Sequence, residues 1–128
     1  MIVREVSEVE GTRSDASGDG WRSRRLLTRA DGMGFTITDT TLRPGMEADL
    51  WYRNHLEACY CLEGEMQVED LETGQVHRVG PGTLYALDRH DRHRVRVLAP
   101  TRLICVFAPA LGGDETHDEH GGYPRAGP

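Results

Sequence analysis

The chain has 128 residues, 38% of them hydrophobic and 28% charged, which is the composition of one globular domain rather than of a disordered segment. Its net charge is −6 and all 15 basic residues are arginine, so a lysine Schiff base is excluded and nucleic acid is not an expected partner. No apolar run reaches the roughly 20 residues that cross a bilayer. The charged beginning of the chain is unlike a secretion signal, so we expect a cytoplasmic protein with no membrane contact.

Short β-strands are predicted along most of the chain. Residues 34–42 alternate in polarity and are rich in Thr and Ile, as expected of a half-buried strand. Between residues 57 and 82 we expect two strands around the turn EGE, and a second turn at ETGQ. Further strands are expected at 83–88, 93–99 and 101–109, separated by the link RHDR and by an Ala-Pro pair.

The pattern of these strands predicts an all-β fold. From His93 to Val97 the apolar residues alternate with Arg94 and Arg96, which gives one dry face and one wet face. No segment has an apolar stripe of helical length, and 15 glycines punctuate the strands. We therefore expect an antiparallel sandwich or barrel.

One domain over residues 1–128 is expected, because neither an internal repeat nor a linker divides the chain. Its Gly-rich C-terminal tail, residues 112–128, is predicted to close over the barrel mouth and to exclude water.

The three cysteines do not predict a disulfide framework. Cys59 and Cys61 are two residues apart, so on a strand they share one face, and we interpret both as small buried apolar residues. They lack the CxxC spacing of zinc sites, so they do not predict a zinc site.

Two segments resemble the metal-binding motifs of the cupins, which are small jelly-roll β-barrels. The motif positions that this chain keeps are Gly45, Glu57, Gly64, Gly74 and Gly82. The positions that carry the metal-binding histidines of cupins hold Trp51, Arg53 and Tyr85 instead. Either the metal was lost, or the site was rebuilt from Glu57, Tyr85 and His93. Two oxygen ligands and one nitrogen suit Fe(II), Mn(II) or Zn(II), and the spacing leaves both explanations open.

Blocks along nearly the whole chain resemble one cupin family, the ectoine synthases. The blocks are MIVR at the start, HLEACYCLEGE, PGTLYALDRHDRH, CVFAPALGG and DETHDEHGGY. The resemblance implies a lyase that forms ectoine, a compatible solute used under osmotic stress. In that reaction the α-amine of N-γ-acetyl-L-2,4-diaminobutyrate attacks its own acetamide carbonyl, and water is lost. The resemblance also implies a homodimer.

The resemblance implies metal ligands at Glu57, Tyr85 and His93, with Fe(II) as the expected ion and Mn(II) or Zn(II) as alternatives. The substrate is expected to contact Trp21, Arg25, Thr38, Thr40, Tyr52, Cys105, Phe107, Glu115 and His117. Of these, Tyr52, Glu115 and His117 are expected to be the catalytic acid–base groups. Arg25 would bind the substrate carboxylate in a fork and Glu115 the ammonium group. In an extended tail, Glu115 and His117 would point the same way.

Some alternatives stay open. His55 shares a strand face with Glu57 and is a candidate ligand by spacing, although we favour a supporting or core role. A non-catalytic cupin that binds a small polar metabolite would need the same pocket. A metal-dependent cupin oxygenase would need the same ligands and room for O₂.

Overall fold

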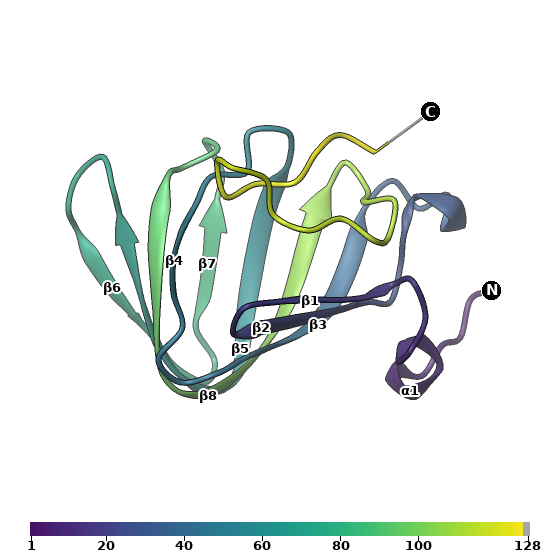
Figure 1. Ribbon diagram of the computed structural model, residues 1–128, viewed down its shortest axis with the longest axis horizontal. Helices are drawn as coiled ribbons and strands as arrows, with labels where there is room; N and C mark the ends of the chain where they lie inside the picture. Colours follow the sequence, from purple (N-terminus) through teal and green to yellow (C-terminus); the bar gives the residue numbers. More distant parts are fainter. Residues whose placement is uncertain (127–128) are drawn as a thin grey trace.

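The computed structural model describes residues 1–126 as a curled β-sheet with a long C-terminal tail (Figure 1). The elements are α1 (Val6–Val9), β1 (Asp15–Gly18), β2 (Trp21–Arg25), a 3₁₀ turn (Arg29–Asp31), β3 (Thr36–Leu42), β4 (Glu47–Leu50), β5 (Leu56–Asp70), β6 (Val76–Val79), β7 (Leu84–Leu87) and β8 (His93–Ala108). The predicted all-β class is confirmed. Among the described residues, no helix has the length and apolar character needed to cross a membrane. Positions 127–128 of the predicted tail lie outside the described residues.

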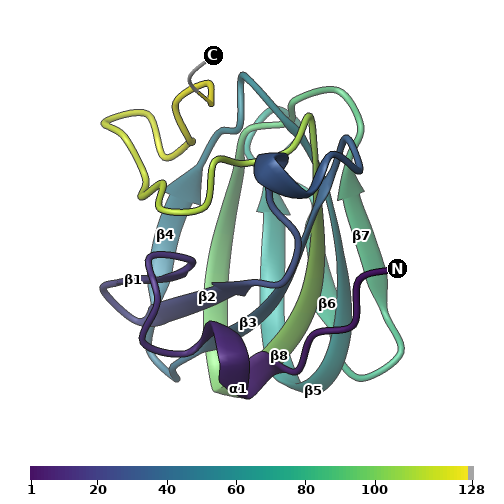
Figure 2. The same ribbon diagram turned by 90° about the vertical axis from the view of Figure 1, so that its right-hand side faces the viewer.

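Two long strands, β5 and β8, form the spine of the sheet. They pair antiparallel from Leu56 opposite Ala108 to Asp70 opposite His93. Each strand is long enough to have different outer neighbours along its length: β7 and β3 flank one half of the pair, and β6 and β4 flank the other. Strands β1 and β2 extend the sheet beyond β3. The views in Figures 1 and 2 show how this arrangement curls the sheet around an interior.

Two interruptions predicted from the sequence are wrong. The EGE segment does not turn, because β5 passes through it with three register shifts, and Gly64 there has a φ of 106°. Likewise, β8 passes through the Ala-Pro pair without ending. Register shifts of this kind bend a strand, so the two strands can serve both halves of the curled sheet. The predicted ETGQ turn does separate β5 from β6.

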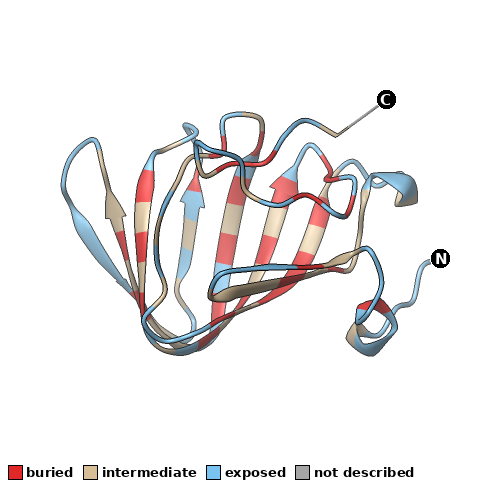
Figure 3. Cartoon of the chain, in the orientation of Figure 1, coloured by how far each residue is buried: buried red, intermediate tan, exposed pale blue. Residues whose placement is uncertain are grey.

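The concave face of the sheet carries the core, as the red segments of Figure 3 show. Along β8 the residues His93, Val95 and Val97 are buried while their neighbours are only half-buried, which confirms the predicted alternation. Met66 of β5 and Leu103 of β8 are both almost completely buried. Burial of such a side chain stabilises the fold by roughly 1.5–3 kcal/mol. Trp21, at the edge of the sheet, begins β2.

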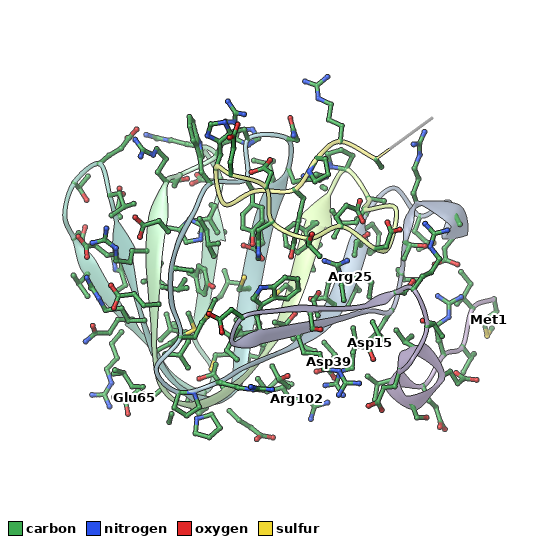
Figure 4. All side chains as sticks on the ribbon, in the orientation of Figure 1. Met1, Asp15, Arg25, Asp39, Glu65 and Arg102 are labelled. Atoms are coloured by element: carbon green, nitrogen blue, oxygen red, sulfur yellow. The ribbon has the colours of Figure 1, made fainter. Side chains whose placement is uncertain are left out.

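An ion-pair cluster holds β2, β3 and β8 together. Asp39 of β3 accepts hydrogen bonds from Arg24 at 2.9 Å and from Arg102 at 2.6 and 3.0 Å. In Figure 4, Asp39 and Arg102 lie close together below the sheet. Burial raises the pKa of Asp39, but the hydrogen bond from Arg102 and the charges of both arginines outweigh it, so the pKa is lowered overall.

Gly64→Ala is expected to destabilise the protein strongly. A β-carbon at this position would lie 2.5 Å from the carbonyl oxygen of Pro100, and φ is in a region that L side chains rarely adopt. Strain alone costs about 1–3 kcal/mol, and the backbone contact adds to it. The free energy of unfolding in urea measures the effect.

The matched control is Gly74→Ala, since Gly74 also has a positive φ of 76° but has open space around it. We expect its loss of stability to be about 1 kcal/mol. Equal losses in the two variants would contradict the role of the close contact at Gly64.

The stability contributed by Asp39 is expected to depend on pH. Its pKa in the folded protein is below the unfolded value of about 3.9, so the stabilisation is present above pH ~4 and is lost as the pH falls through the folded pKa. Asp39→Asn should therefore lower the free energy of unfolding at pH 7 by roughly 1.5–3 kcal/mol and flatten its decline in acid. In Asp19→Asn, where the carboxylate is exposed, the decline should match that of the wild type.

Candidate active site

The curled sheet encloses a cavity of about 50 Å³. Its walls come from six strands, from Tyr52 in the loop after β4, and from His117 and Tyr123 of the tail. The tail, yellow in Figure 1, crosses the open end of the barrel, where the backbone amide of Trp51 donates to Gly121 at 3.0 Å. A cavity of this size holds a few water molecules.

The register of three strands gathers acidic groups on one wall of this cavity. Cys59 of β5 is paired on one side with Tyr85 of β7 and on the other with Cys105 of β8. Glu57 precedes Cys59 by two residues and therefore shares its face of β5. The ligand atoms of Glu57, Cys59 and Cys105 all lie within 4.8 Å of one another.

Burial favours the protonated forms of Glu57, Tyr85 and Cys59 in the absence of a cation. It raises the pKa of Glu57 to about 7 and raises the pKa of Tyr85 and of Cys59 well above their ordinary values. A cation placed among them would replace their lost hydration and favour the deprotonated forms. The donor chemistry of this wall therefore fits a metal ion.

His93 is not among the residues that line this cavity. Its Nδ1 is 2.9 Å from the carbonyl oxygen of Asp91, which can only accept, so Nδ1 carries the hydrogen and Nε2 keeps its lone pair. Nε2 is buried without a hydrogen-bond partner, and burial lowers the pKa of the ring, so it is neutral. Such an imidazole has the form of a metal ligand. His93 lines an adjoining cavity of about 320 Å³ that Tyr85 also lines.

The cavity wall also carries a pair of groups suited to proton transfer. The hydroxyl of Tyr52 lies 2.8 Å from Nε2 of His117. Burial, together with the nearby charge of Arg25, lowers the pKa of His117 to about 4, so the imidazole is neutral at pH 7. Burial raises the pKa of Tyr52, so its phenol is protonated. The pair joins the barrel to the tail.

Aromatic rings hold His117 in place. Its ring stacks on Tyr123 with centroids 4.7 Å apart, and Trp21 meets it edge-on at 4.9 Å. Phe107 contacts both Tyr52 and Tyr123. Sequence reasoning missed Tyr123, whose only signal was an aromatic residue in an otherwise polar, Gly-rich tail.

Arg25 holds the tail against the barrel through hydrogen bonds to its backbone. Its guanidinium, labelled in Figure 4, donates to Ser23 at 2.9 Å, to the carbonyl of Gly113 at 2.9 Å and to that of Glu115 at 2.8 Å. The side chain is almost fully buried and faces the ring of Tyr123. Among the described residues no carboxylate forms an ion pair with it, so it is a buried positive charge with only neutral partners. Two of its five N–H groups remain free for another acceptor.

The expectation that Glu115 and His117 point the same way is wrong. The carboxylate of Glu115 turns back to accept hydrogen bonds from the amides of Gly112 at 2.6 Å and Gly113 at 2.8 Å, because these two amides are the nearest donors in the bend of the tail. Only His117 lines the cavity. Contact between Glu115 and the substrate stays a prediction.

Some of the other residues predicted to contact the substrate line the cavity, and some do not. Thr40, Cys105 and Phe107 line the cavity. Thr38 does not, since its hydroxyl is fully buried behind Thr40 and bonds to it at 2.8 Å. His55 also lies outside the cavity wall, buried against Phe107 and Tyr123, as a core histidine would be.

Comparisons with known proteins place this site in a family. The model of the ectoine synthase family matches residues 1–127. The chain belongs to the ectoine synthase family. L-ectoine synthase of Desulfatibacillum aliphaticivorans is 49% identical over 97% of each chain, and that of Desulfosudis oleivorans is 52% identical over 96% of each.

Solved structures agree with this membership. The crystal structure of ectoine synthase from P. lautus is 44% identical, with a TM-score of 0.87 over 99% of this chain and 92% of that one. An RmlC-like cupin from Shewanella frigidimarina, 23% identical, has a TM-score of 0.60 over 73% of this chain and 79% of that one, which shows the shared cupin fold. The ectoine synthase fold is thus that of a cupin, as predicted.

Arg25→Gln is expected to loosen the tail of this ectoine synthase family member. The change removes hydrogen bonds to the carbonyls of Gly113 and Glu115, each worth roughly 1–2 kcal/mol. Amide hydrogen exchange across residues 112–123 should then accelerate at least about tenfold. Arg22→Gln is the control on the same strand, because Arg22 pairs with Asp15 and Glu10 on the surface. Equal exchange in both variants would show that Arg25 does not hold the tail.

Proposed function

We propose that the protein is an L-ectoine synthase that closes N-γ-acetyl-L-2,4-diaminobutyrate into ectoine with loss of water. Membership of the family over nearly the whole chain supports this function. The observation that carries it is the cavity itself, whose wall carries buried groups suited to holding a metal together with the neutral Tyr52–His117 pair. A Lewis acid and proton-transfer groups are what an intramolecular dehydration of an amide uses.

We infer that Glu57, Tyr85 and His93 hold a divalent metal, with Fe(II) the expected ion and Mn(II) or Zn(II) the alternatives. Glu57 and Tyr85 share the cavity wall, and the free Nε2 of His93 is an unused donor. The chemistry expected of such an ion is Lewis-acid polarisation of the acetamide oxygen.

The substrate would be oriented by the walls of the cavity. Its carboxylate would supply the counter-charge that Arg25 lacks, using the two free N–H groups of the guanidinium. Trp21 and Phe107 would enclose the apolar chain, with Thr40 and Cys105 beside them. Thr38 would act only through the hydroxyl of Thr40. In this arrangement the substrate displaces the few water molecules that fit in the closed cavity.

Proton transfer falls to Tyr52 and His117, with Glu115 as a further candidate at the bend of the tail. As the α-amine attacks the carbonyl carbon, a C–N bond forms and the nitrogen must lose a proton, which the neutral His117 can accept. The carbonyl oxygen must gain two protons as the C–O bond breaks and water leaves. The Tyr52–His117 pair can pass on the proton of the attacking nitrogen, and the second proton is released from a ring N–H as the C=N bond of the amidine forms. General acid–base catalysis of this kind contributes about 10²–10⁴-fold in rate.

We also propose that the enzyme is cytoplasmic, forms a homodimer and serves the response to osmotic stress. These proposals follow from its family membership. Light scattering at micromolar concentration tests the dimer, and a monomeric mass would contradict it.

The reaction is tested by anaerobic incubation of the metal-loaded protein with N-γ-acetyl-L-2,4-diaminobutyrate, with ectoine detected by proton NMR. We expect product without O₂, which would exclude an oxygenase. Failure to form ectoine with Fe(II), Mn(II) or Zn(II) would contradict the proposal and favour a non-catalytic binding protein.

Variants of the site separate metal binding from proton transfer. Tyr85→Ala and His93→Ala should lose both bound iron and turnover, while Tyr52→Phe should keep its iron and lose about 10²–10⁴-fold in kcat. His77→Ala, at an exposed histidine of β6, is the control. Full iron content and full rate in either of the first two variants would overturn the ligand assignment.

A further inference from the structure

A pair of cysteine thiols faces the same cavity beside the proposed metal ligands. Cys59 and Cys105 are directly opposite each other on β5 and β8, and both are almost completely buried. Neither is needed as a metal ligand in the proposed reaction. The pair cannot be recognised from the sequence, because the two residues come from strands that are far apart in the chain.

The geometry of these thiols with Glu57 is close to that of a thiolate metal site. Two sulfur ligands about 2.3 Å from a tetrahedral zinc ion lie about 3.8 Å apart, and a carboxylate oxygen lies slightly nearer. The corresponding atoms of Glu57, Cys59 and Cys105 all lie within 4.8 Å of one another. All three side chains project from paired strands in the middle of the sheet. Shifts of about 1 Å or less, within the reach of side-chain rotation, would complete the set.

We propose that Glu57, Cys59 and Cys105 form a second metal-binding set, selective for thiophilic divalent ions such as Zn(II), Cd(II) and Co(II). The absence of a CxxC motif does not count against it, since the two sulfurs are brought together by strand pairing. The proposal rests on the position of these three side chains and does not depend on the reaction that the enzyme catalyses.

Glu57 belongs to both metal sets, so an ion held by the sulfurs competes with an ion held by Glu57, Tyr85 and His93 for the same carboxylate. Hard ions such as Mn(II) prefer the oxygen and nitrogen donors, whereas thiophilic ions prefer the sulfurs. Because thiols bind metals as thiolates, capture of an ion releases protons. Thiophilic ions are therefore expected to compete with the metal that the proposed reaction uses.

The test uses the reduced, metal-free, full-length protein titrated with Co(II) under argon. We expect one equivalent of Co(II) to give a sulfur-to-cobalt charge-transfer band in the near ultraviolet. Zn(II) or Cd(II) should then abolish the band by displacement. X-ray absorption of the Zn(II) form should show two sulfur scatterers at about 2.3 Å, a result that needs no variant protein.

Cys61 provides a matched control. It is fully buried two residues beyond Cys59, but its Sγ contacts the backbone carbonyl of Glu63 at 3.3 Å instead of joining the set. Cys61→Ser should keep the charge-transfer band, and the double variant Cys59→Ser, Cys105→Ser should lose it. Binding of Mn(II), followed by its electron paramagnetic resonance signal, should be the same in the double variant and the wild type. Circular dichroism checks that each variant is folded.

Sulfur-free coordination of Zn(II) in the wild type would overturn the proposal. So would a charge-transfer band that survives in the folded double variant or disappears in Cys61→Ser. These readouts are spectroscopic, so an inactive wild-type enzyme would contradict the proposed reaction and leave this result unaffected.

Discussion

The pairing of β5 with β7 on one side and β8 on the other is the constraint on which the site depends. It places Cys59 between Tyr85 and Cys105 and turns Glu57 to the same face. A slip of one residue in this register would turn every one of these side chains to the outer surface. The register is held by the apolar residues that follow on the same strands, such as Met66 and Leu103. The core that stabilises the fold thus also determines which donors meet in the cavity.

The sequence predicted strands in the regions of β3 and of β5 to β8, but it missed the short strands β1, β2 and β4 and placed several strand ends wrongly. Period-two alternation identifies the buried face of β8 correctly, because one side of that strand contacts the core and the other contacts solvent. Strands were also predicted to end at EGE and at the Ala-Pro pair, because glycine and proline usually mark turns. Here Gly64 instead supplies the positive φ of a bulged, continuous strand. Local sequence cannot distinguish a turn from a bulge, because the difference lies in the pairing with a distant strand.

The structure places Trp21, Tyr52, Glu57 and His117 at the cavity, and their expected roles stay predictions. The side chain of Glu115 turns away from that of His117 because it accepts hydrogen bonds from two amides of the tail, and spacing alone does not reveal such contacts. The pairing of Cys59 with Cys105 was likewise invisible, since the two residues meet only when the sheet forms. Tyr123 was overlooked because its neighbours in the sequence are polar.

The hydrogen bond between Tyr52 and His117 links the barrel to the tail. One partner belongs to the barrel and the other to the tail, so the pair exists only while the tail is docked. When the tail is undocked, His117 and Tyr123 leave the cavity wall and the hydrogen bond to Tyr52 is lost. Covering the cavity and assembling this pair are therefore one and the same movement.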